Sequence, residues 1–195
     1  TTNEDTPSTA VTPSGSDPDD DNTTAASLTY TIDSQPQLGT ATIDTTPTDA
    51  NYNKIVFDPG QAFQYLAVNE SRDVTLTYHA TDKWGAVSNT GTVTIHVTGV
   101  NDAPTAVNDS NQTDQNTTIT VPAIDPITSQ PSLNALLTND TDPDVSDTLT
   151  ITAVNDNLNG ANVGNQFALA SGALLTVDSN GGYTYDPNGK FNYLA

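Results

Sequence analysis

Two stretches of this chain repeat each other. Residues 55–67 read IVFDPGQAFQYLA and residues 183–195 read YTYDPNGKFNYLA, so six of thirteen positions are identical at an offset of 183 − 55 = 128 residues. A second pair, SDPDDDNTTAASLTYTI at 16–32 and TDPDVSDTLTITAV at 141–154, runs from an Asp-Pro-Asp cluster into an alternating segment in each copy. A chain that holds two copies of one unit is expected to fold as two small domains of like architecture.

The pattern within each copy is that of short strands. Threonine, valine and tyrosine alternate with other residues in runs that turn residues bound, and this pattern predicts half-buried strands. The predicted strands are 8–12, 27–33, 39–44, 53–58, 74–81 and 90–99 in the first copy, and 105–109, 117–122, 148–154, 164–169, 173–178 and 182–186 in the second. Aromatic residues are only 6% of the chain, which suits the thin core of a sandwich. We therefore predict an all-β fold of tandem Ig-like or cadherin-like antiparallel β-sandwiches.

The boundary between the copies is predicted in Gly99–Pro104, because proline cannot continue a ladder. This gives a repeat at 1–103 and a second at 104–195. The second copy is expected to be incomplete, because it stops where counterparts of the strands 74–80 and 92–100 would begin. A sandwich without its last two strands exposes sheet edges, and it is expected to be poorly stable unless another chain supplies them.

The charge of the chain is extreme. It has 24 Asp and Glu against 4 Lys and Arg, a net charge of −20. Such a surface repels nucleic acid and anionic lipid headgroups, and no run approaches the roughly 20 apolar residues of a membrane span. We therefore expect no nucleic-acid partner and no membrane insertion. The chain also has no cysteine, so a bound cation is a plausible substitute for a disulfide staple.

The carboxylates are clustered, and the clusters suggest a metal. Alternating Asp-x-Asp spacing lets side chains two apart converge on one ion, and Ca²⁺ takes six to eight oxygens in flexible geometry, whereas Mg²⁺ needs a tighter octahedron. Single Asp residues between strands also serve simply as turn residues. The predicted calcium ligands are Glu4, Asp5, Asp17, Asp19, Asp21, Glu70, Asp82, Asn101, Asp102, Asp140, Asp142, Asp144 and Asp147.

The order of strands suggests which clusters meet. The 13–26 loop and the hairpin tip at Asp82 are expected at one end of the first copy. The other end is expected to bring eight of the predicted ligands to the linker at 99–104, namely Glu4, Asp5, Glu70, Asn101, Asp102, Asp140, Asp142 and Asp144.

Catalysis has little support in the sequence. His79 and His96 both lie on predicted strands, where histidine is expected as a surface or cross-strand residue, and no Gly-rich phosphate loop follows a strand. Carboxylate pairs of the glycosidase type abound, but nothing singles out one pair. We expect that this chain is not an enzyme. Trp84 stands at a predicted hairpin tip, where it could stack on a sugar ring or cover the end of the core.

Three motifs carry a family resemblance. They are Asn3-Glu-Asp-Thr6, Asn139-Asp-Thr-Asp-Pro-Asp-Val-Ser-Asp-Thr-Leu149 and Val100-Asn-Asp-Ala-Pro104, together with the strands that begin at Val74 and Thr92. The chain resembles the bacterial cadherin-like repeats of the tandem-95 and VCBS groups, found in RTX-type surface adhesins. The resemblance covers nearly the whole chain. It implies calcium at the repeat junctions, an extracellular or bacterial cell-surface location, and a role as a rigid extender or adhesive module in adhesion or biofilm.

The leading expectation is thus a calcium-binding structural or adhesive module whose partners are calcium and neighbouring repeats of the same chain. The alternative is a carbohydrate-binding module for exopolysaccharide, using Trp84 and exposed tyrosines. An aromatic platform on a sheet face would favour this alternative, and a polar threonine-rich face would favour the spacer. Homophilic adhesion or a cell-surface receptor is a third possibility.

Overall fold

The computed structural model describes residues 1–18, 28–154 and 162–194. The chain forms two compact units, which are described separately. The first comprises Thr1–Asp102 together with Pro143–Ser146, and the second comprises Ala103–Asp142 and Asp147–Ala195. The predicted boundary at 103/104 differs from this division by one residue and by the four-residue segment 143–146. No helix with the length and apolar character of a membrane span occurs among the described residues.

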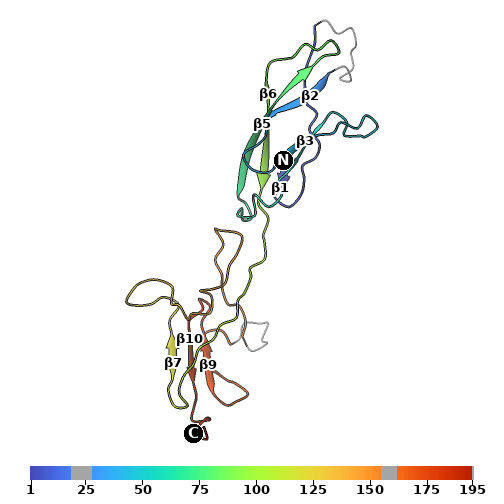
Figure 1. The fold of residues 1–195 in the computed structure, drawn as a ribbon. Helices are drawn as coiled ribbons and strands as arrows, with labels where there is room; N and C mark the ends of the chain where they lie inside the picture. The colour runs from blue at the N-terminus through green and yellow to red at the C-terminus, as the bar shows by residue number, and fades with distance from the viewer. Residues whose placement is uncertain (19–27, 155–161, 195) are drawn as a thin grey trace. The chain divides into compact units, whose positions relative to one another are not determined.

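In the first unit, the residues that the structure describes form two sheets (Figure 1). Its strands are β1 (Thr2–Asn3), β2 (Thr29–Ser34), β3 (Thr40–Ile43), β4 (Ile55–Asp58), β5 (Ser71–Thr81) and β6 (Gly91–Thr98). One sheet has the order β1-β6-β5-β2, and the other pairs β3 with β4. All pairs are antiparallel except β1 with β6, which is parallel and places Asn3 opposite Thr98. This parallel pair brings the N-terminal segment to the end of β6.

Alternation along β5 builds the core of the first unit. Val74, Leu76, Tyr78 and Ala80 are buried, and they pack in one cluster with residues of β2, β3, β4 and β6. Phe57 on β4 is completely buried in the same cluster. A fully buried side chain such as Leu76 or Phe57 contributes roughly 1.5–3 kcal/mol by leaving water. The two sheets therefore form a sandwich, as the alternating sequence predicts.

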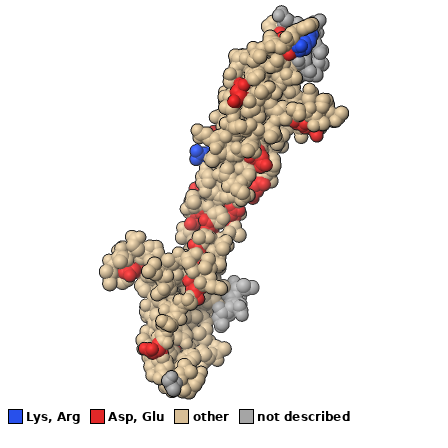
Figure 2. All heavy atoms as spheres, in the orientation of Figure 1, with Lys and Arg blue, Asp and Glu red and all other residues tan. Residues whose placement is uncertain are grey.

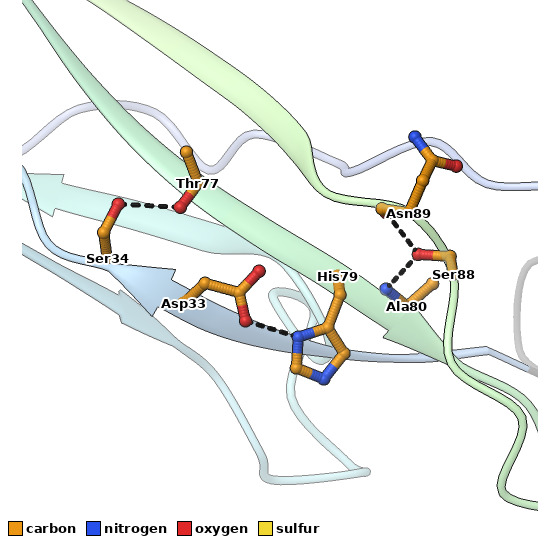
Figure 3. Close-up of polar contacts among 7 residues, drawn as sticks. All are labelled: Asp33, Ser34, Thr77, His79, Ala80, Ser88 and Asn89. Atoms are coloured by element: carbon orange, nitrogen blue, oxygen red, sulfur yellow. Dashed lines mark hydrogen bonds and ion pairs between the residues drawn. The ribbon is translucent and has the colours of Figure 1, made fainter.

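The opposite face of the β1-β6-β5-β2 sheet is polar. Thr75 and Thr94 are exposed and lie opposite each other on β5 and β6. Asp33 Oδ1 lies 2.5 Å from His79 Nδ1 across β2 and β5, and the Ser34 and Thr77 hydroxyls are 2.7 Å apart beside them (Figure 3). The side chains named on this face offer hydroxyl, carboxylate and imidazole groups for hydrogen bonding.

The described residues of the second unit form one sheet. Its strands are β7 (Ile119–Val121), β8 (Phe167–Ala168), β9 (Leu174–Val177) and β10 (Tyr183–Asp186), in the order β7-β10-β9-β8. All three pairs are antiparallel, and Figure 1 labels β7, β10 and β9 of this sheet. The all-β Ig-like fold class is confirmed.

The repeat seen in the sequence is also a repeat in structure. Asp58 Oδ1 accepts a hydrogen bond from Gly60 N–H at 3.0 Å, and Asp186 Oδ1 accepts the equivalent bond from Asn188 N–H at 2.8 Å. Gly60 and Asn188 both have positive φ, 56° and 50°. Glycine and asparagine are the residues that tolerate this conformation best, so both copies turn the same corner after β4 and β10.

The predicted strands agree with the observed strands better in the first unit than in the second. Five of the six in the first copy correspond to β2–β6, whereas 8–12 contributes only a bridge from Val11 to Ile55, and β1 was not predicted. In the second copy, 105–109 supplies only a bridge from Thr105 to Thr141. The described residues of 148–154 form no strand, although Ile151 N–H donates to the Ser179 carbonyl. A run of alternating residues becomes a strand only where a partner strand accepts its hydrogen bonds.

Candidate functional site: three converging carboxylates

Glu4 is a buried carboxylate at the end of β1. Its backbone N–H continues the ladder by donating to the Thr98 carbonyl at 3.0 Å, and its side chain is 0% exposed. Asn3 makes this possible, because its Oδ1 accepts from Asp5 N–H and from the Thr6 hydroxyl and so closes a tight turn around Glu4. Asn3 thus helps to hold Glu4 inward, while Asp5 is exposed.

Only half of the Glu4 carboxylate has a hydrogen-bond partner. Oε1 accepts from Val100 N–H at 2.8 Å. Oε2 is buried and makes no hydrogen bond to any residue that the structure describes. A buried carboxylate oxygen without a hydrogen-bond partner is costly to the folded chain.

Asp102 and Asp144 meet Glu4. One carboxylate oxygen from each of the three residues lies within 4.8 Å of the other two, and all three residues belong to the first unit. Asp144 is 1% exposed, and its Oδ2 accepts from Asp102 N–H at 2.9 Å. Within the described residues, this is the one group of three or more such side chains that could hold a metal ion.

The electrostatics of the group are unfavourable without a cation. Burial raises the pKa of Glu4 above its ordinary value, the Val100 N–H opposes this rise, and the nearby charges of Asp102, Asp144 and Asp5 add to it. Like charges this close repel, and a divalent cation would offset both the repulsion and the desolvation.

Gly99 allows the chain to reach the site. Its N–H donates to the Glu70 carbonyl at 3.0 Å, and a Cβ at this position would lie 2.2 Å from the Leu66 carbonyl oxygen. The backbone after β6 therefore passes so close to Leu66 that only glycine fits. This packing fixes Val100, whose N–H holds Glu4. Gly99 was predicted only as part of the boundary between the two copies, and its role at this site was not predicted.

Most of the other residues predicted as ligands at this end make hydrogen bonds outside the group of three. Asp5 Oδ1 accepts from Gln64, Glu70 Oε2 accepts from Ala67 N–H, and Asp140 Oδ1 accepts from Val107 N–H. Asn101 donates to the Asp102 carbonyl at 2.6 Å. Asp142 and Asp147 lie outside the group of three. Of the eight residues expected to converge, the structure brings together Glu4, Asp102 and Asp144.

A second acidic region lies at the tip of the β5–β6 hairpin. Asp17 and Asp82 line one hollow of about 670 Å³ in the first unit. Asp82 Oδ1 accepts from Trp84 N–H and Ala86 N–H, which is the bonding of a turn residue. Asp19 and Asp21 lie outside the described residues. The two described carboxylates do not by themselves make a metal centre.

The histidines are tied to neighbouring aspartates. His96 Nδ1 lies 2.7 Å from Asp73 Oδ1, and these two residues face each other in the β5–β6 register. His79 is held by Asp33 in a similar way (Figure 3). No hydroxyl is bonded to either ring within the part of the chain that the structure describes, so neither pair has the form of a nucleophile and its base.

Comparison with known families identifies part of the chain. Residues 101–194 match the family model described as a bacterial Ig domain. This part of the chain is similar to a bacterial Ig-like repeat. Domains of this family are typically non-enzymatic and often occur on surface proteins, where they act as structural or adhesive modules. No curated protein matches the chain.

Proposed function

We propose that this chain is a calcium-binding structural or adhesive repeat module of a secreted or surface-attached bacterial protein, with Glu4, Asp102 and Asp144 as ligands of one ion. The observation that carries the proposal is the buried Glu4 Oε2, which lacks a hydrogen-bond partner and lies in a group of three carboxylates. The bacterial Ig-like match of residues 101–194 supports the module class. The tandem-95 and VCBS type remains part of the proposal.

The chemistry of the ligand set favours Ca²⁺. Three carboxylates can supply up to six oxygens when they bind through both atoms, and calcium accepts mixed one- and two-oxygen binding at six to eight positions. Mg²⁺ retains several waters and is poorly served by a site whose Glu4 and Asp144 are almost completely buried. An extracellular setting suits the weak class of calcium sites, around 10⁻⁴–10⁻³ M.

The ion would have a mechanical role. Asp102 lies at the end of the first unit's main segment, and Asp144 lies on the segment Pro143–Ser146, whose flanking residues on both sides belong to the second unit. A cation shared by Glu4, Asp102 and Asp144 would hold two segments of the first unit next to Glu4, the one that ends at Asp102 and the segment Pro143–Ser146. In this proposal calcium stiffens the junction between repeats, and its loss lets the junction loosen.

Calcium binding to the metal-stripped chain, measured by titration calorimetry, tests this proposal. We expect saturable binding of Ca²⁺ with much weaker binding of Mg²⁺, and a loss of at least tenfold in affinity in Glu4→Gln and Asp144→Asn. Asp147→Asn is the matched control, because Asp147 is exposed and outside the group. Equal affinity in all four proteins would contradict the site.

A carbohydrate-binding role is the second candidate, and Trp84 is the observation that favours it. This ring is 82% exposed at the hairpin tip, with Lys83 Nζ 5.7 Å from its centre. The polar face of the β1-β6-β5-β2 sheet, with Thr75 and Thr94, argues for the spacer instead. A polysaccharide pull-down that Trp84→Ala abolishes would support the carbohydrate role.

A further inference from the structure

The two lateral sides of the first unit are closed in different ways. On one side the N-terminal segment covers both sheets. Asn3 lies opposite Thr98 of β6, and Val11 exchanges backbone hydrogen bonds of 2.8 and 2.9 Å with Ile55 of β4. On the other side β2 ends the four-stranded sheet, and β3, which contacts β2, pairs only with β4 among the described strands. The outer edges of β2 and β3 are therefore the places where a further strand could pair.

The edge of β3 is occupied by a side chain. Gln35 Nε2 donates to the Ala41 carbonyl at 2.9 Å, and Gln35 Oε1 accepts from Ala41 N–H at 2.8 Å. A carboxamide is a neutral group that offers both a donor and an acceptor, as a peptide group does. Gln35 thus reproduces the two hydrogen bonds that a residue of a neighbouring antiparallel strand would make to Ala41.

The edge of β2 is occupied in the same manner by Asn53. Its Nδ2 donates to the Leu28 carbonyl at 2.6 Å, and its Oδ1 accepts from Tyr30 N–H at 3.2 Å. Tyr30 lies opposite Ala80 on β5, whose own N–H and carbonyl bond to Ser88. The pair of Tyr30 and Ala80 therefore exchanges no ladder hydrogen bond, and the backbone groups of Tyr30 face outward to Asn53.

Backbone geometry holds both amides in place. Gln35 precedes Pro36, and a residue before proline is restricted to extended conformations. Asn53 has a φ of 61°, a left-handed conformation that asparagine adopts more readily than most residues. Its N–H also donates to the Asp44 carbonyl at 2.7 Å. Each amide therefore starts from a backbone position that the fold has already fixed.

The edge of β3 has no other protection of its own. Strand edges are commonly blunted by charged residues, prolines or β-bulges. β2 has such devices in Asp33 and in a register shift between Ile32 and Ser34. β3 is the uncharged sequence Thr40–Ile43, and it pairs with β4 in regular register. Although the whole chain has a net charge of −20, β3 has no charged residue that would repel a neighbouring strand.

We propose that Gln35 is an edge plug, a side chain that keeps β3 from pairing with β3 of a second copy of this chain, and that Asn53 has the same role at β2. A second copy presents the identical edge, and two identical edges are self-complementary about a twofold axis. Without the Gln35 amide, Ala41 N–H and carbonyl lose their partners and bond to Ala41 of the second copy. This inference is independent of the calcium site.

Sedimentation velocity of the full chain across a concentration series in EDTA tests the proposal. Gln35→Ala should lower the dimer dissociation constant by about tenfold or more relative to the native chain, as two added hydrogen bonds would. Gln37→Ala is the matched control at an exposed residue of the same type, and it should behave as the native chain does. Gln35→Glu also loses the donor to Ala41, but its charge should keep the edge from pairing.

Amide exchange locates the contact. In the native chain the Ala41 amide should exchange slowly at every concentration, because Gln35 accepts its hydrogen. In Gln35→Ala it should exchange fast in dilute solution and slowly in concentrated solution. The Leu76 amide in β5 reports whether the fold is intact, and it should stay protected in all variants.

Three results would overturn the proposal. One is a Gln35→Ala variant that associates no more strongly than the native chain. Another is equal association of Gln35→Glu and Gln35→Ala, because a general loosening of the fold would then drive it. The third is association that occurs only where the Leu76 amide has lost its protection, which would be aggregation of unfolded chains.

Discussion

At the scale of single residues, the chain places one carboxylate where burial and charge both oppose ionisation. Glu4 is 0% exposed beside Asp102 and Asp144, and the chain carries far more acids than bases, as Figure 2 shows for one face. Asn3, Gly99 and Val100 all serve to position this carboxylate. A carboxylate that the fold keeps buried at a cost to stability is expected to be stabilised by a bound ligand.

The raised pKa of Glu4 predicts an unusual pH dependence in calcium-free solution. Below the ordinary value of 4.5 the carboxyl is protonated in folded and unfolded chains, and its favourable contribution is fully present. As pH rises through the raised folded-state pKa, this contribution is lost. In EDTA at pH 7, Glu4→Gln is therefore expected to be more stable than the native chain, measured as the free energy of urea unfolding.

Calcium should reverse that order. With excess Ca²⁺ at pH 7 the native chain gains stability that Glu4→Gln does not, so the native chain becomes the more stable protein. Asp147→Asn is expected to follow the native chain in both conditions. If Glu4→Gln is less stable than the native chain at pH 7 in EDTA, the account of Glu4 is wrong.

Gly99 predicts a link between packing and ion binding. In Gly99→Ala the new Cβ must move the backbone at Leu66, which costs about 1–3 kcal/mol as overpacking does. The displacement also moves Val100, so the calcium dissociation constant should rise. Gly85→Ala adds only the strain of its φ of +88° at the hairpin tip, and it should leave calcium affinity unchanged. Calorimetric titration of both variants distinguishes the effects.

At the scale of elements, the sequence predicted the first unit better than the second. The alternation around Leu76 and Ile95 correctly predicted β5 and β6, because each strand has a partner and a sheet to pack against. The same pattern failed at 148–154, because no β5-like partner is present among the described residues of that unit. β1 was missed because two residues cannot show a period, and its pairing depends on β6.

The candidate site, too, could be predicted from the sequence only in part. Its residue types could be predicted from the acidic motifs, and Glu4, Asp102 and Asp144 were all among the predicted ligands. Which three of the thirteen would meet depends on the parallel β1–β6 pair and the path after Gly99. The sequence pattern contains neither, so Asp142 and Asp144 looked equivalent although only Asp144 joins the group.

The repeat gives a matched pair of substitutions at this scale. Phe63→Ala removes a completely buried ring and should cost about 3–5 kcal/mol. Phe191→Ala removes the equivalent, partly exposed ring and should cost less than half as much. Hydrogen exchange of β4 and β10 amides reports the two losses separately. Equal losses would show that Phe191 is as well covered in solution as Phe63.

At the scale of the whole molecule, self-repulsion is the dominant electrostatic term. With 24 acids and 4 bases, the chain carries a net charge of −20. Raising ionic strength from 0.01 M to 0.15 M shortens the screening length from about 30 Å to about 8 Å. In EDTA, added NaCl should therefore raise the melting temperature. With calcium bound the rise should be smaller, and an equal rise would mean that the ion relieves none of the repulsion.

The most direct test of the central claim is the thermal unfolding of the chain in EDTA and across a calcium titration, with Mg²⁺ as the control. At a hundredfold excess over the dissociation constant, calcium should add about 2.7 kcal/mol. For a domain of this size that gain corresponds to a rise of about 10 °C or more in melting temperature. We predict this rise for the native chain and Asp147→Asn, and its loss in Asp144→Asn. A melting temperature that calcium does not change would contradict the account.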